Sequence, residues 1–179
     1  MKSYLHHRFW HWSCAVMTVL LLMIGYYMTY MSDYRLYHVH KSLAIVMVCL
    51  FIPRAALRAM APWPSAVQGA KRHMLSLFHW SLILLTAVLL ISGASYSGFG
   101  GYGIALFSLP LISKNLDELG SVEAINATLS EVGLQVHVIA ALLLAVLIGA
   151  HIFAALIHHF KYKDDTLKRM IRGPKELRE

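Results

Sequence analysis

Long stretches without charged residues recur along this chain, and they determine its predicted architecture. A helix needs about 20 apolar residues to cross the hydrocarbon core of a bilayer. The stretch from Phe9 to Met31 contains no Asp, Glu, Lys or Arg, and the charge-free stretch from His73 to Ser113 is too long for one straight span. The glycine-rich segment 97–103 interrupts this second stretch, so we expect the third helix to end near Tyr96. The four predicted spans are residues 9–31, 36–57, 74–96 and 132–160.

The segment 97–130, between the last two spans, has no strong periodicity and is predicted to be an irregular extracytoplasmic loop. Within it, Ser113 and Gly120 could cap one short helix, and Ser121 could start another. The pattern as a whole predicts an all-α protein, an integral membrane four-helix bundle that forms a single domain over residues 1–179.

The basic residues orient this bundle, because cytoplasmic segments near the ends of spans collect Lys and Arg. Of the 16 basic residues, only Arg35, Lys41 and Lys114 fall on one side of the predicted topology. The other side carries the remaining thirteen, together with both chain ends. The N- and C-termini are therefore predicted to be cytoplasmic.

The composition agrees with a membrane protein, since 58% of the residues are hydrophobic, 14% are charged and the mean hydropathy is +0.58. The pI of about 9.5 is explained by this topology and by contacts with anionic membrane lipids, and no basic soluble face suggests nucleic-acid binding. Cys14 and Cys49 lie inside apolar stretches, and neither belongs to a C-x-x-C-H motif. Covalent haem attachment and a disulfide scaffold are therefore not expected.

The candidate chemistry lies among eleven histidines, because imidazoles at membrane depth usually face a bundle interior or a ligand. His137 and His151 are 14 residues apart, so they share a helix face with about 21 Å of rise between them. This spacing suits one helix that supplies an axial ligand to each of two b-type haems. His40 matches the depth of His137 on the outer side. On the inner side, both His11 and His79 could pair with His151, and His79 could instead belong to a quinone site.

Three further residues could serve these sites. His158 continues the ligand face beyond His151 and could form a quinone or proton site at the inner surface. Arg54, on the face of His40 but at the inner end, could contact a haem propionate, and Lys41 could do so at the outer end. The other histidines are expected to be interfacial or solvated, namely His6, His7, His38, His73 and His159.

Several segments together carry a family resemblance that covers nearly the whole chain. They are His11-Trp12, His40 followed by Arg54, His79, His137 with His151, Ile157-His158-His159-Phe160, and the tail from Lys163 to Met170. With these features the sequence resembles the bacterial cytochrome b561 family of stand-alone dihaem membrane cytochromes. The resemblance implies two noncovalent haem b groups in the bacterial inner membrane, one held by His11 with His151 and the other by His40 with His137.

Members of this family include an enzyme that takes electrons from superoxide and delivers them to ubiquinone, which the resemblance implies as donor and acceptor here. The outer side of this chain carries three basic and five acidic residues, a net charge of minus two. A superoxide anion would therefore need local attraction by Arg35, Lys41 or Lys114.

Two other functions are compatible with the sequence. The chain could be a cytochrome b subunit that links a dehydrogenase or hydrogenase to quinone, which would require a redox partner protein. It could instead be a non-redox membrane protein that binds metal ions through its histidines, although this would not explain their pairing at two depths.

Overall fold

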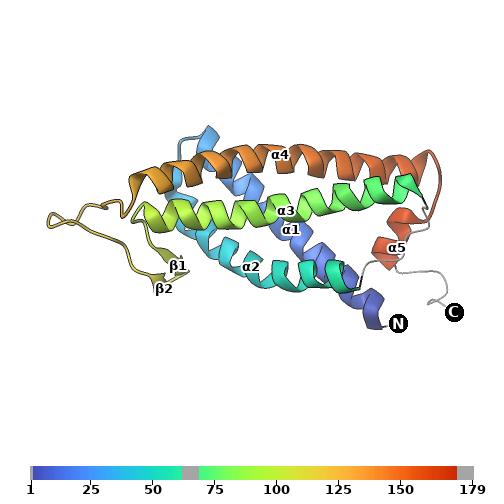
Figure 1. The fold of residues 1–179 in the computed structure, drawn as a ribbon, viewed down its shortest axis with the longest axis horizontal. Helices are drawn as coiled ribbons and strands as arrows, with labels where there is room; N and C mark the ends of the chain where they lie inside the picture. The colour runs from blue at the N-terminus through green and yellow to red at the C-terminus, as the bar shows by residue number, and fades with distance from the viewer. Residues whose placement is uncertain (1, 62–68, 173–179) are drawn as a thin grey trace.

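The computed structural model describes residues 2–61 and 69–172, and its fold is dominated by four long helices (Figure 1). All four are long and apolar enough to cross a membrane. The elements in chain order are α1 (Lys2–Tyr30), η1 (Tyr34–Leu36), α2 (Tyr37–Met60), α3 (Ala70–Phe99), β1 (Ile104–Leu106), β2 (Leu109–Ile112), α4 (Ala127–Phe160) and α5 (Thr166–Arg172).

Each helix extends beyond its predicted span at one end or both, and α3 does so at both ends. It continues past Tyr96 through Ser97 and Gly98 to Phe99, so the predicted end was too early. The break comes at Gly100 and Gly101, and Gly101 has a φ of +74°, a left-handed conformation that favours glycine. A Cβ on Gly101 would lie only 2.1 Å from the carbonyl oxygen of Glu123. The helix therefore ends where the backbone of the following loop packs against it.

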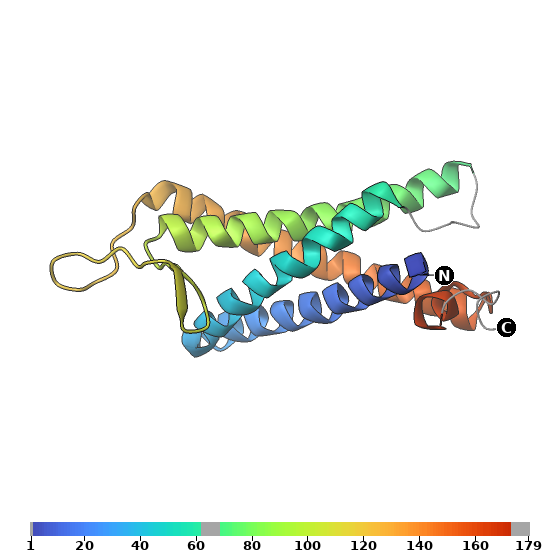
Figure 2. The same cartoon turned by 90° about the horizontal axis from the view of Figure 1, so that it is seen from below.

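The four long helices form two pairs, with α1 packed along α2 and α3 packed along α4 (Figures 1 and 2). The two pairs contact each other at far fewer positions. The start of α1 and the helix α5 lie at the same end of the bundle, opposite the loop that carries β1 and β2. Many large apolar side chains are exposed on the helices, as expected of a surface that faces lipid.

Small residues bring α3 and α4 together, as is common where membrane helices pack closely. A Cβ on the buried Gly133 would lie 2.8 Å from the backbone nitrogen of Tyr96 and 3.1 Å from the carbonyl oxygen of Ser92. One turn earlier in α4, the Ser130 hydroxyl donates to the carbonyl oxygen of Tyr96 at 3.1 Å. The α3–α4 contact therefore depends on the absence of a side chain at Gly133 and on the hydrogen bond from Ser130.

The loop between α3 and α4 does not contain the short helices that the sequence suggested at Ser113 to Gly120 and from Ser121. It contains a two-stranded antiparallel hairpin, β1–β2, instead. The Asp117 carboxylate accepts hydrogen bonds from the backbone N–H of Leu119 and Ser121, which closes a turn in place of a helix. Gly120 sits in that turn with a φ of +80°.

The hairpin is attached to α2 by the buried Ser42, whose hydroxyl oxygen accepts from the backbone N–H of Phe107 at 2.7 Å. At the end of the loop, the Asn126 side chain caps α4 by accepting from the backbone N–H of Leu129. The loop is thus fixed at both the α2 and the α4 side.

We predict that Gly133→Ala lowers the stability of the folded protein by about 1–3 kcal/mol, because the added methyl group cannot fit against the α3 backbone. Gly149→Ala is the matched control, since a Cβ there meets nothing within 4 Å. It should be neutral or slightly stabilising, because Ala is the better helix former. Thermal unfolding of the two variants in detergent makes the comparison, and equal melting temperatures would contradict this view of the α3–α4 contact.

Candidate haem-binding site

One pair of histidines faces each other near the outer end of the bundle, the end with the β1–β2 hairpin. His40 on α2 and His137 on α4 have ring centroids 6.3 Å apart. An imidazole nitrogen binds a transition-metal ion at about 2.0 Å, so two rings on opposite sides of one iron place their centroids roughly 6.3 Å apart. The two rings are therefore at the separation that an iron between them requires.

The surroundings of His137 fix the orientation of its ring. Its Nδ1 lies 3.0 Å from the carbonyl oxygen of Leu89 and 3.3 Å from the Ser92 hydroxyl, both on α3. A carbonyl only accepts, so Nδ1 carries the proton and Nε2 keeps its lone pair for a metal. Gly93 leaves room for this ring, because a Cβ there would lie 3.0 Å from His137 Cε1. This is the arrangement typical of an iron-ligating histidine.

The His40 ring has fewer polar contacts. Its Nδ1 is buried and has no hydrogen-bond partner within the described part of the chain. The ring packs near Gly25 of α1, where a Cβ would lie 3.6 Å from His40 Cε1. A buried imidazole without a full set of partners is costly at membrane depth, and binding of iron would compensate for part of that cost.

A second pair lies toward the other end of the bundle. His11 on α1 and His151 on α4 have ring centroids 6.4 Å apart, again close to the separation for two ligands of one iron. The His151 ring also stacks on Phe78 of α3, with an interplanar angle of 23°. This pair joins α1 to α4, whereas the outer pair joins α2 to α4.

His79 is the second inner histidine that the sequence left open as a partner of His151. Its ring centroid lies 5.3 Å from that of His151, about 1 Å less than a shared iron requires. Its Nδ1 lies 2.6 Å from the carbonyl oxygen of Leu75 in the preceding turn of α3. The ring separations therefore favour His11 as the partner and leave His79 beside the inner pair.

The two basic residues considered as propionate contacts differ in their surroundings. Arg54 extends to the inner pair, with Nη2 3.5 Å from His11 Nδ1, so its charge lies where an inner haem would be held. Lys41 contacts the end of α3 and the turn that follows it. Its ammonium group donates to the Ser97 hydroxyl and to the carbonyl oxygens of Tyr102 and Gly103. In this arrangement the Lys41 ammonium group holds the turn after α3.

His158 has a partner that the sequence reasoning missed. Its Nδ1 lies 2.5 Å from Asp164 Oδ2, and both side chains are partly exposed at the end of α4. The signal in the sequence was an acidic residue six positions after the histidine, just past the end of the helix. The imidazole and the carboxylate are therefore paired just beyond the end of α4.

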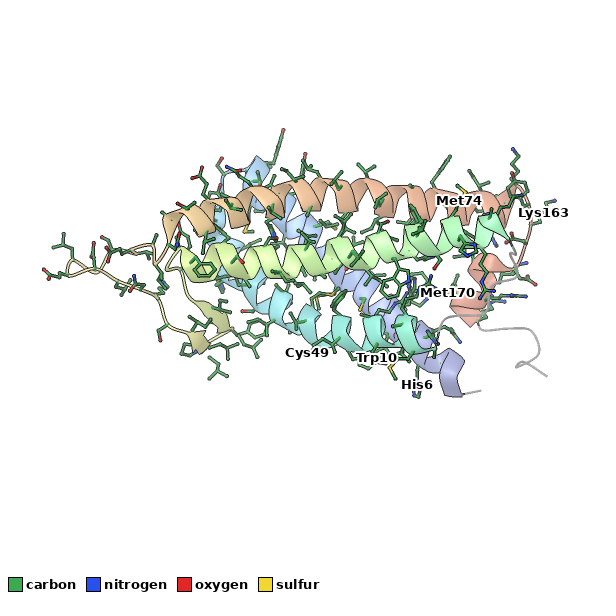
Figure 3. The ribbon with its side chains drawn as sticks, viewed as in Figure 1. His6, Trp10, Cys49, Met74, Lys163 and Met170 are labelled. Atoms are coloured by element: carbon green, nitrogen blue, oxygen red, sulfur yellow. The ribbon has the colours of Figure 1, made fainter. Side chains whose placement is uncertain are left out.

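The remaining histidines follow the default expectation only in part. His6, His38 and His73 are exposed, as predicted. His7 is buried, with 7% of its surface exposed, because it faces into the bundle at the start of α1. His159 is partly buried. Figure 3 shows His6 projecting near the N-terminal end of α1, at the same end of the bundle as Lys163 and Met170.

The histidine-lined metal carrier considered from the sequence would need several ligands gathered around one ion. Within residues 2–61 and 69–172, no three His, Cys, Asp or Glu side chains come together in a way that could hold a metal ion. The imidazoles are arranged as facing pairs, which suits the two axial positions of a haem iron.

Comparisons with known proteins identify the family to which the chain belongs. The family model for prokaryotic cytochrome b561 matches residues 5–173. The chain is 30% identical over 169 residues to cytochrome b561 homolog 2 of Escherichia coli (strain K12), which covers 90% of this chain and 86% of the relative. It is 28% identical over 136 residues to a probable superoxide oxidase CybB of Yersinia pestis, covering 74% of this chain and 73% of the relative. No solved structure matches. The chain is a helical membrane protein of the prokaryotic cytochrome b561 family, whose members bind haem b.

Proposed function

We propose that this protein is a dihaem cytochrome b of the bacterial inner membrane that transfers electrons from superoxide to ubiquinone. The observation that carries this proposal is the presence of two histidine pairs, with ring centroids 6.4 and 6.3 Å apart, at two levels of α4. His137 and His151 are about 21 Å apart along α4, which is most of the roughly 30 Å hydrocarbon core.

When bound, haem b supplies one-electron redox chemistry, while the protein supplies position and electrostatics. His40 and His137 would hold the outer group, and His11 and His151 the inner one. The Leu89 carbonyl keeps the Nδ1 proton of His137 in place, so that the Nε2 lone pair remains directed away from α3. Arg54 would balance the negative charge of the inner group's propionates.

The side of electron entry follows from the distribution of basic residues. The start of α1, the helix α5 and most of the described Lys and Arg residues lie at the end of the inner pair, which supports a cytoplasmic location for that end. The β1–β2 hairpin and the outer pair would then face the extracytoplasmic side. A donor such as superoxide would arrive there, and a lipid-soluble quinone would be reduced at the opposite surface.

The charges at the outer side favour Lys41 and Lys114 as the attraction for a small anion. Lys114 is exposed and lies within electrostatic reach of Lys41. Arg35 contributes little, because its guanidinium pairs with Asp33 at 2.6 Å. Hydrogen bonds from the side chain and the backbone N–H of Arg35 hold the pKa of Asp33 well below its usual range. The carboxylate therefore stays charged and neutralises the arginine. The name of the Yersinia pestis relative supports superoxide as the donor.

The acceptor side needs protons as well as electrons. Two superoxide anions give up one electron each and become two O2, while one quinone takes up these two electrons and two protons to become quinol. We assign delivery of these protons to the His158–Asp164 pair, because it lies at that surface and a positioned imidazole can act as a general acid.

The ligand assignment predicts how haem content responds to three substitutions. Because the two pairs are separate, His40→Ala and His11→Ala should each lower the haem content from about two to about one per chain. His79→Ala is the control and should keep both. The pyridine haemochrome assay on folded, monodisperse protein measures this. The contrary result is a folded His11→Ala protein that retains two haems and a His79→Ala protein that loses one. That result would assign the inner ligand to His79 in place of His11.

The donor assignment predicts a salt-dependent rate. Lys114→Gln should slow reduction of the protein by superoxide several-fold at low ionic strength and much less at high ionic strength, because steering of an anion is screened by salt. The control is the double substitution Asp33→Asn with Arg35→Gln, which removes a neutralised pair and should change the rate little. Stopped-flow or pulse-radiolysis measurements give the rates. Equal rates for Lys114→Gln and the unsubstituted protein at low salt would contradict this role of Lys114.

The acceptor assignment predicts a loss confined to quinone reduction. His158→Ala should retain both haems and still be reduced at the outer side, but its electron transfer to a soluble ubiquinone analogue should slow by about 100-fold, the typical contribution of a positioned acid. Asp164→Asn should give a smaller loss, because the imidazole remains. Unchanged quinone reduction in His158→Ala would exclude this residue from proton delivery without affecting the haem assignment.

A further inference from the structure

The short helix α5 is fixed across the end of the bundle. It follows α4 after a turn in which Lys163 adopts a φ of +52°, and it packs against the end of α4. Its last carbonyl groups are held by α1. The Trp12 indole donates to the carbonyl oxygen of Met170 at 2.9 Å, and the Arg8 guanidinium donates to that of Ile171. These contacts hold α5 in a defined position between the two helix pairs.

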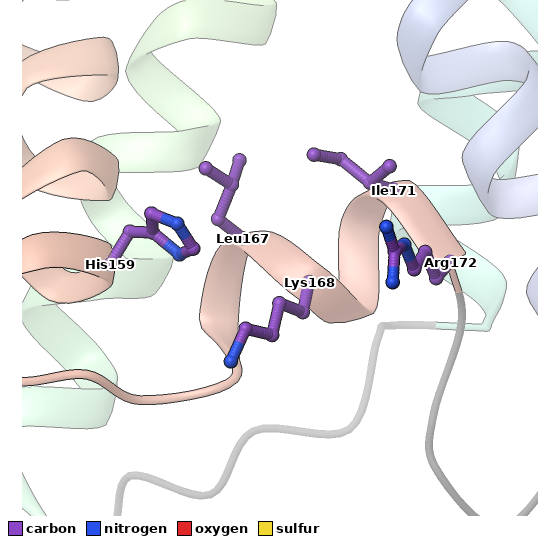
Figure 4. Close-up of a pocket in the computed structure, with 5 residues that line it drawn as sticks. All are labelled: His159, Leu167, Lys168, Ile171 and Arg172. Atoms are coloured by element: carbon purple, nitrogen blue, oxygen red, sulfur yellow. The ribbon is translucent and has the colours of Figure 1, made fainter.

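A hollow lies between α5 and the end of α4 (Figure 4). Leu167 and Ile171 are one helical turn apart on α5, and they provide its apolar part. Lys168 and Arg172 are likewise one turn apart and give the hollow two cationic side chains. The residues that line it are His159, Leu167, Lys168, Ile171 and Arg172.

The charges around this hollow leave it positive. Lys168 has a carboxylate neighbour, Asp165, but the distance is 3.7 Å and the lysine is half exposed, so the pair is weak. The nearby Asp164 is already paired with His158. On the α4 side, the buried Nδ1 of His159 has no hydrogen-bond partner among the described residues. The hollow thus combines two cations, an imidazole nitrogen and an apolar wall.

We propose that this hollow binds the headgroup of an anionic phospholipid, with the phosphate near Lys168, Arg172 and His159 and the acyl chains along Leu167 and Ile171. The location supports a lipid, because the hollow lies just beyond the end of α4, a helix long and apolar enough to cross a membrane, and headgroups are expected at the end of such a helix. Basic side chains at this depth attract anionic lipids, and apolar side chains beside them match the start of the acyl chains. This inference is independent of the electron donor and acceptor.

The first test uses the unsubstituted, haem-loaded protein. It is mixed in detergent with dioleoyl phosphatidylglycerol or dioleoyl phosphatidylcholine, and bound lipid is counted by native mass spectrometry. Retention of one phosphatidylglycerol in the presence of a tenfold excess of phosphatidylcholine is the expected result. A ligand that binds only the folded state also raises the melting temperature, so phosphatidylglycerol should stabilise the protein more than phosphatidylcholine does. Equal retention of the two lipids would overturn the proposal.

The second test uses a matched pair of double substitutions. Lys168→Gln with Arg172→Gln should weaken phosphatidylglycerol binding roughly 30-fold, the loss expected for two basic residues near an anionic headgroup. Lys71→Gln with Arg72→Gln removes the same charge from the start of α3, at the same end of the bundle but outside the hollow. This control should change binding less than threefold. Equal losses in the two doubles would mean that only the overall charge matters, which contradicts a defined site.

Competition with free phosphate and a pair of single substitutions complete the test of the lipid site. Inorganic phosphate at millimolar concentration should not displace the lipid, and efficient displacement would show a free-phosphate site and refute the lipid assignment. If the double variant does not fold with its haem, Lys168→Gln alone is compared with Lys71→Gln alone, with about a fivefold difference expected.

Discussion

The rest of this structure depends on one constraint, which is that imidazole rings on one helix pair face imidazole rings on the other. Membrane helices gain little from apolar burial against each other, because the lipid is as apolar as the helix surface. Here α1 packs on α2 and α3 on α4, while the two pairs meet at few positions. Two histidine pairs face each other across that division. The ring centroids are 6.4 Å apart for His11 and His151, and 6.3 Å apart for His40 and His137. A ligand held by both pairs would join the two halves of the bundle.

Several local features serve this one constraint. Gly93 makes room for the His137 ring, and Gly133 lets α3 approach α4 closely enough for the Leu89 carbonyl to meet that ring. At the outer end, Lys41 holds the turn after α3 and Ser42 holds the hairpin, both from the helix that carries His40. The helix α2 is thereby fixed to the loop between α3 and α4. At the inner end, α5 holds α1 one residue beyond His11 through Trp12.

The sequence predicted the features that depend on local pattern. Charge-free stretches identify the four helices because the bilayer imposes a minimum length, and the 14-residue spacing on α4 identifies the two levels. Features that depend on tertiary contacts could not be read in this way. His11 and His79 lie at similar depths, so only their ring distances to His151 separate them. The use of Lys41 by the turn after α3 and the pairing of His158 with Asp164 likewise depend on how the chain folds back.

The central claim, that the chain holds two separate bis-histidine haems, is tested most directly by a redox titration of the purified protein followed by low-temperature electron paramagnetic resonance. The account predicts two low-spin ferric signals that disappear at separate potentials as the protein is reduced. Each signal should integrate to about one spin per chain. A single low-spin signal that integrates to one spin per chain, or a high-spin signal from an iron with one histidine ligand, would contradict the account.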